Sequence, residues 1–152
     1  NGGYPILRWQ STLKADAVDN VIAKIDAIGS VTVTSGDVIA EARNAYDALS
    51  TELQALVSNK AALEQAEADY QAALFAQKQA QAKQEIETYK SLSDYRANEQ
   101  AQLTQIIAEA KQAIDAATTN DAVEAAVAAA KVKADKVKTN AQLTADEEAF
   151  AA

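Results

Sequence analysis

The side chains that could carry out chemistry in this sequence are mostly carboxylates, because the chain contains neither histidine nor cysteine. Close carboxylate groupings occur at Glu85 with Glu87, Glu147 with Glu148, and Asp115 near Asp121. An acid/base pair needs two carboxyl groups whose surroundings separate their pKa values. Each grouping here stands among glutamine, alanine and threonine in positions that we expect to be exposed. The pattern therefore favours solvated helix faces over acid/base catalysis.

Three other kinds of chemical site are also disfavoured by the local sequence. Ser35 has no histidine in the chain to activate it as a nucleophile. The turn at residues 35–37 lacks the glycine-rich loop and the following lysine that cradle a phosphate. Residues 118–121 lack the alternating acidic ligands of a calcium loop and fit a helix cap better. We therefore expect a non-enzymatic chain with no catalytic residue, no cofactor and no metal site.

Aromatic side chains are the remaining candidates for contact with a partner. The tyrosines of the helical regions lie on or beside apolar stripes, where they can fill a core or form an amphipathic surface patch. The stripes favour the core, but Tyr89 and Tyr95 flank a turn that can leave one of them exposed. Trp9 could stack on a sugar ring, although packing against a neighbouring domain or the first helices is favoured. The possible partner-binding residues are therefore Tyr89, Tyr95 and Trp9.

Composition and charge narrow the classes of protein to which the chain can belong. The net charge is −8, and the lysines are spread singly, which argues against binding nucleic acid or anionic lipid. No apolar run approaches the roughly 20 residues that span a bilayer. The absence of cysteine is typical of extracytoplasmic bacterial proteins. The chain lacks an initial methionine, so we expect it to begin within a longer protein.

The first half of the chain shows the three- and four-residue apolar spacing of helices. The first stripe begins after Asp16 and stops at Gly29, a residue suited to the position that follows a helix. Ser35 is expected to cap a second helix, and a shorter third helix follows it. We therefore expect residues 13–75 to form a first helical bundle.

The middle of the chain is expected to be one long helix. Residues 76–85 are strong helix formers with almost no large apolar side chain. A helix that is polar on nearly all sides commonly bridges two domains. We expect a single helix over residues 60–90, whose part at residues 76–90 continues from the first bundle into the second.

The second half of the chain is expected to form a second helical bundle at residues 91–140. A serine-rich turn at residues 91–94 precedes its first helix, and residues 118–121 connect that helix to the last one. The last helix carries small apolar residues in the four- and three-residue steps of a coiled-coil seam. Residues 141–152 are expected to be a tail toward a following module.

The N-terminal residues differ in composition from all that follow. They hold the only proline and the only tryptophan, and residues 4–9 have the pattern of an extended segment. We expect residues 1–12 to be an extended tail or the last strand of a preceding β-rich domain. The expected fold class is all-α, with two small antiparallel bundles of about three helices each. A long shared helix joins them, and a short extended segment precedes them.

Two stretches of the chain resemble helical repeats of large Gram-positive surface and S-layer-type proteins. The first runs from Val21 to Tyr70, with its characteristic segments at residues 25–29 and 42–49. The second runs from Tyr89 to Leu143 and resembles the FIVAR-type alanine-rich three-helix bundles. The resemblance implies an all-α architecture and a secreted or cell-wall-attached location.

Three functions remain open at this point. The first is a non-catalytic spacer module of a multidomain surface protein, whose partners are the neighbouring domains of the same chain. The second is a protein-binding bundle, adhesin-like, that presents a helical face to a host protein such as an immunoglobulin. The third is a sugar-binding accessory module of a multimodular glycosidase. All three assume no binding to nucleic acid and no membrane insertion of this segment.

Overall fold

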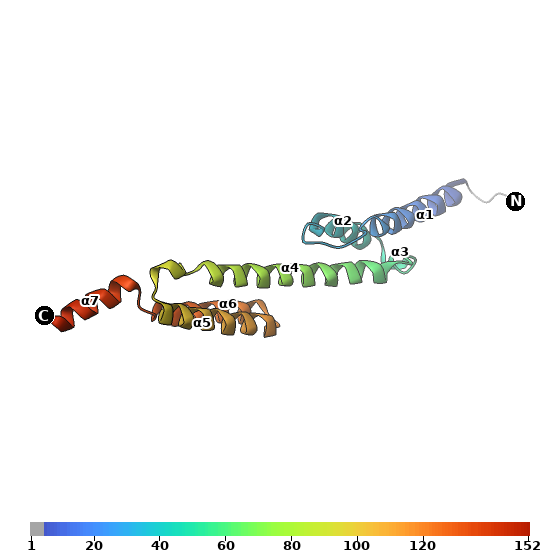
Figure 1. Cartoon of the computed structure of the whole chain (residues 1–152). Helices are drawn as coiled ribbons and strands as arrows, with labels where there is room; N and C mark the ends of the chain where they lie inside the picture. Colours follow the sequence, from blue (N-terminus) through green and yellow to red (C-terminus); the bar gives the residue numbers. More distant parts are fainter. Residues whose placement is uncertain (1–4) are drawn as a thin grey trace. The chain divides into compact units, whose positions relative to one another are not determined.

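The computed structural model describes the backbone of residues 5–152 and the side chains from Trp9 onward. This part of the chain is all-α and contains no β-strand. The chain divides into two compact units, residues up to Leu74 and Phe75–Ala152. The elements, shown in Figure 1, are α1 Pro5–Asp26, α2 Gly36–Asp47, α3 Thr51–Gln54, α4 Lys60–Thr88, the 3-10 helix η1 Leu92–Asp94, α5 Ala97–Ala116, α6 Asn120–Asp135 and α7 Asn140–Ala151.

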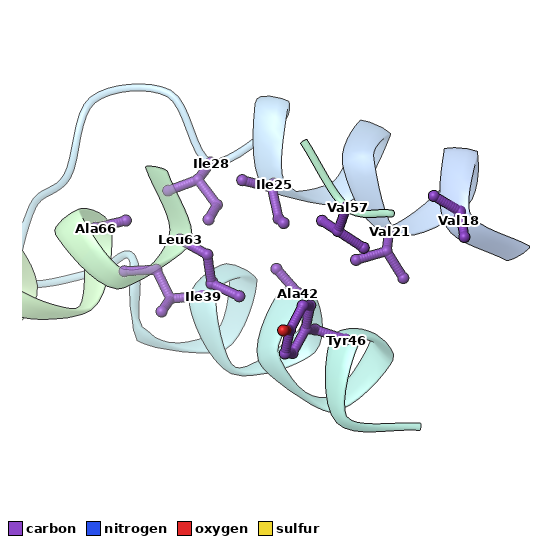
Figure 2. Packing of buried hydrophobic residues seen from close by; sticks show 10 residues of the cluster. All are labelled: Val18, Val21, Ile25, Ile28, Ile39, Ala42, Tyr46, Val57, Leu63 and Ala66. Atoms are coloured by element: carbon purple, nitrogen blue, oxygen red, sulfur yellow. The ribbon is translucent and has the colours of Figure 1, made fainter. Parts of the chain in front are cut away.

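The first unit buries one face of each of α1, α2 and the first part of α4. Branched aliphatic side chains recur on α1 at three- and four-residue steps, so they point to one side of the helix. Figure 2 shows them meeting Ile39, Ala42 and Tyr46 of α2 and Leu63 of α4. The buried residues of this core are Val18, Val21, Ile25, Ile28, Ile39, Ala42, Tyr46, Val57, Leu63 and Ala66. The expected apolar stripes therefore do form a core.

Gly29 and Ser35 lie in the connection between α1 and α2, as expected, but the Ser35 side chain has a different role from the one predicted. Gly29, just beyond α1, has a φ of 60°, in the left-handed region that glycine adopts without penalty. Ser35 immediately precedes α2, as predicted. Its hydroxyl makes no cap on α2 and instead accepts a hydrogen bond from the backbone N–H of Thr32 at 2.9 Å. The serine therefore stabilises the turn rather than the helix end.

The expected extended segment at residues 1–12 is wrong from Pro5 onward, because α1 begins there. Proline fits the first position of a helix, where its fixed φ is suitable and its missing N–H is not needed. Residues 9–16 of α1 are all exposed, so no buried strand face is present to favour an extended backbone. Residues 1–4 lie outside the described part of the chain.

Helix α4 is one continuous helix of 29 residues, as predicted for residues 60–90. Figure 1 shows it without a break. Its first part contributes Leu63 and Ala66 to the core of the first unit. Its second part contributes Ala82 and Ile86 to the core of the second unit. A single helix is therefore a structural part of both units.

The second unit packs the second part of α4 with α5 and α6, two helices that lie side by side in Figure 1. Its main core is small, since most of its buried side chains are alanine or valine. These buried residues are Ala82, Ile86, Ala110, Ile114, Val123, Val127 and Ala130. A second, smaller cluster contains Tyr95, Leu103, Ala134 and Val137.

The turns of the second unit lie where the sequence predicted them. The 3-10 helix η1 occupies the serine-rich turn, and Thr119 caps α6 by accepting a hydrogen bond from the N–H of Ala122. The segment at residues 141–152, expected to be a tail, is the helix α7. It begins with a capping box between Thr139 and Gln142, a reciprocal arrangement that satisfies two backbone groups.

Candidate functional site

The second unit is crossed by a set of ion pairs between its helices, which we call the ion-pair ladder. Between α4 and α6 the pairs are Lys78–Glu124 and Glu85–Lys131, and Lys90, two residues beyond the end of α4, pairs with Asp135 of α6. Between α4 and α5 they are Lys83–Asp115 and Glu87–Lys111, and between α5 and α6 the pair is Lys133–Glu109. From one pair to the next, the residue numbers on α4 and α6 increase together, whereas the numbers on α5 decrease as those on α4 increase. The three helices therefore run up, down and up.

A groove of about 370 Å³ lies between α4 and α6 and is spanned by the ladder. Ala82, Val123 and Val127 form part of its lining, and all three are buried core residues. The remaining lining is mostly polar and includes both members of the Lys78–Glu124 and Glu85–Lys131 pairs. The groove is therefore an open channel of small apolar residues with charged rims, and its rim charges are already paired across it.

Tyr89 directly follows α4 and is held by its neighbour Lys90 and by groups of α6. Its hydroxyl donates to the carboxylate of Asp135, 3.0 Å from each oxygen. The ammonium groups of Lys90 and Lys131 lie 4.8 and 5.0 Å from the centre of its ring, within the range of cation–π attraction. The hydrogen bond from Lys90, then that from Tyr89, lowers the pKa of Asp135 below its ordinary value. Tyr89 is therefore half-buried and already engaged within the unit.

The other two aromatic candidates have opposite environments. Tyr95 is buried, with 5% of its surface exposed, in the small cluster beside Leu103 and Val137. It takes the core alternative that the apolar stripes favoured. Trp9 is 64% exposed on α1, so the packing favoured for it from the sequence is not found in the described part of the chain. Tyr89 and Tyr95 belong to one unit and Trp9 to the other.

No protein-family model, curated protein or solved structure matches this chain. The resemblance to surface-protein repeats therefore rests on the sequence stretches quoted above.

The carboxylates considered for acid/base chemistry are mostly engaged in ion pairs. Glu85, Glu87 and Asp115 belong to the ladder, and Glu147 pairs with the guanidinium of Arg96. The hydrogen bond from Arg96 lowers the pKa of Glu147 below its ordinary value. Among the described residues, no group of three or more acidic side chains is placed to hold a metal ion, and no helix is long and apolar enough to cross a membrane.

The first unit has its own polar contact between α2 and α4. The guanidinium of Arg43 donates to both carboxylate oxygens of Glu67, each at 2.6 Å. Such a two-point contact has a fixed geometry and is stronger than a single hydrogen bond. It lowers the pKa of Glu67 and raises that of Arg43. Arg43 also lies 5.4 Å from the centre of the Tyr46 ring, so the pair covers the edge of the core.

Sequence reasoning missed the ion-pair ladder because it treated these charges as solvated faces. A signal was nevertheless present in the spacing. Lys78 and Glu85 are seven residues apart, and Glu124 and Lys131 repeat that spacing with the signs reversed. Charges seven residues apart lie on the same flank of a coiled-coil seam, where they pair with a neighbouring helix. Aligning two expected helices and comparing the charges at matching positions would have predicted these pairs.

Gln79 is a further residue whose role the sequence did not reveal. It belongs to the polar stretch of α4, yet its side-chain amide is directed at α5. The amide donates to the carbonyl of Ile114 at 2.7 Å. The same carbonyl also accepts from the backbone N–H of Ala117 at 3.2 Å, so the Gln79 amide is a second donor to it at the end of α5. A glutamine that looked like helix surface is therefore part of the packing.

Proposed function

We propose that this chain is a non-catalytic structural module of a secreted or surface-attached multidomain protein. In this proposal α4 is the working element, because it joins two small helical units without an intervening flexible linker. The observation that carries the proposal is that α4 supplies buried residues to both cores, Leu63 and Ala66 to one and Ala82 and Ile86 to the other. The extracellular location is supported by the absence of cysteine and by the family resemblance.

The residues at the boundary between the units support this role. Ala76 and Gln77, the second and third residues of the second unit, are exposed and helical. A linker that serves only to separate two domains flexibly is typically rich in glycine or serine. This segment instead contains strong helix formers, so a sharp kink in it requires breaking helical hydrogen bonds. In this proposal the polar residues of this segment keep the helix continuous in solvent, and no ligand is needed to account for them.

Spin labels on the two units test the proposal directly, because the chain has no native cysteine that would interfere. Cysteines replace the exposed residues Asn44 on α2 and Gln112 on α5, and pulsed electron resonance gives the distribution of their separation. We expect one narrow distribution. Ala76→Pro should broaden it by interrupting α4, and Ala76→Gln is the matched control that keeps the helix. A broad distribution in the otherwise unchanged chain would contradict a structural role for α4.

The exposed part of α1 supports a second candidate function, the binding of another protein. Trp9 is 64% exposed and Leu13 is 47% exposed, and these two residues are one helical turn apart. Exposed tryptophan is enriched among residues that dominate binding energy at interfaces.

Titration with an immunoglobulin, measured by isothermal titration calorimetry, separates the two functions. Saturable binding that Trp9→Ala and Leu13→Ala both abolish would favour the protein-binding function. Binding to a glycan array that depends on Trp9 would instead favour a sugar-binding module. A structural module should show neither response.

A further inference from the structure

The second unit has little apolar surface with which to fix the axial position of α4. The buried side chains that α4 supplies to the main core there are Ala82 and Ile86, with Phe75 partly buried beside them, and alanine leaves few contacts to distinguish one position from another. In coiled coils with a weakly specific seam, flanking charges commonly decide which register forms. The ion-pair ladder occupies this flanking position. A slide of α4 along its neighbours would therefore change which charges face each other.

The α4–α6 side of the ladder changes sign along the helices. Lys78 faces Glu124, and seven residues later Glu85 faces Lys131. Sliding α4 by seven residues in one direction would place Glu85 opposite Glu124. Sliding it in the other direction would place Lys78 opposite Lys131. Either shift replaces attraction with repulsion between like charges.

The α4–α5 side has the same property over a shorter step. Lys83 faces Asp115, and four residues later Glu87 faces Lys111. A shift of one helical turn would bring Lys83 to Lys111 or Glu87 to Asp115. The pairs with the antiparallel helix α5 therefore disfavour a shift of α4 by one turn. The pairs with the parallel helix α6 disfavour a shift of α4 by seven residues.

We propose that the ion-pair ladder is a register lock, which selects one axial position of α4 against α5 and α6. Exposed ion pairs add little to the free energy of unfolding. Their main effect is therefore the difference in free energy between the native register and the shifted registers, in which like charges meet. The side chains of these pairs remain accessible to solvent, as in Lys78–Glu124, where 34% and 68% of the side-chain surface is exposed. This inference concerns the second unit alone and does not depend on the proposed function.

The test measures register directly in the full chain. Spin labels replace the exposed residues Gln84 on α4 and Ala125 on α6. A slide of seven residues moves the two sites by roughly 10 Å along the axis, from a rise of about 1.5 Å per residue. The decisive variant neutralises the four ladder charges of α4, with Lys78→Gln, Lys83→Gln, Glu85→Gln and Glu87→Gln. Glutamine keeps the helix propensity, so this variant should remain folded.

We expect the original chain to give one separation and the neutral variant to give a second population, displaced by about one helical turn or more. Reversing signs on α4 alone, with Lys78→Glu and Glu85→Lys, should increase the displaced population. Adding Glu124→Lys and Lys131→Glu should restore the original separation.

Gln79→Ala is the matched control, because it removes the amide contact from α4 to α5 and leaves the ladder intact. It should keep the original separation. A neutral variant that retains one separation, identical to that of the original chain, would overturn the register lock. In that case a displaced population in Gln79→Ala would assign the register to the amide contact instead.

Discussion

At the scale of single residues, Asn59 is the polar side chain that ties the start of α4 to the end of α1. Its amide donates to the carbonyl of Ile22 at 3.0 Å and to the carboxylate of Asp26 at 2.8 Å. Both partners are acceptors, so the orientation of the amide is determined by the contacts. The residue that immediately precedes the long helix thus also connects it to the first helix.

We predict that Asn59→Ala lowers the free energy of unfolding by about 1–2 kcal/mol, because it removes two hydrogen bonds, one partly buried and one exposed. Asn59→Asp has the same shape but places a carboxylate against Asp26, so its loss should be larger at neutral pH. Urea unfolding followed by circular dichroism measures both. An aspartate variant as stable as the original chain would show that the contact contributes nothing.

Glu67 gives a prediction on pH dependence. Its pKa is held below the ordinary value of 4.5 by the hydrogen bonds from Arg43. A carboxylate with a lowered folded pKa stabilises the protein fully above its unfolded pKa, and that contribution disappears as the pH falls through the folded pKa. The stability difference between the original chain and Glu67→Gln should therefore be greatest at neutral pH and shrink below pH 4.5.

Urea titrations of both proteins over this range measure the difference directly. Other carboxylates with lowered pKa values, such as Glu41 and Glu109, are present in both proteins and largely cancel. A difference that stays constant with pH would mean that the Arg43–Glu67 contact is not formed in solution.

At the scale of elements, the end of α1 depends on Gly29. Its φ of 60° lies in the left-handed region, and an added Cβ would meet no atom within 4 Å. The cost of Gly29→Ala is therefore conformational rather than steric, and we expect about 1 kcal/mol. Gly29→Asn is the matched control, since asparagine tolerates this conformation better. Thermal unfolding should rank glycine above asparagine and asparagine above alanine, and equal values for all three would contradict the prediction.

The elements also show what sequence reasoning could and could not predict. Helix spacing, Gly29 and the cap at Thr119 gave the main helices and turns, because these signals are local. The helical state of residues 5–12 was missed, since a proline and neighbouring branched and aromatic side chains also suit an extended segment. The pairing of Lys78 with Glu124 was missed because it depends on which helices become neighbours.

At the scale of the whole molecule, the two units share α4 and should share part of their stability. Unfolding one unit removes the packing that holds its part of α4 helical. The adjacent part of the helix then frays, which weakens the other unit. We therefore predict that the midpoints of urea unfolding coincide for the two units. Nuclear magnetic resonance signals of Val21 and Val123, buried in the first and second cores, report them separately.

Ala76→Pro should separate these two midpoints. Proline removes a helical hydrogen bond and clashes with the preceding turn, at a cost of about 3 kcal/mol, so fraying on one side no longer extends to the other. Ala76 is exposed, so the substitution removes no core contact, and Ala76→Gln should leave the midpoints together. If the midpoints of the original chain are already separate, α4 does not couple the units. The long helix would then be a connection without a thermodynamic role, and the structural proposal would lose its main support.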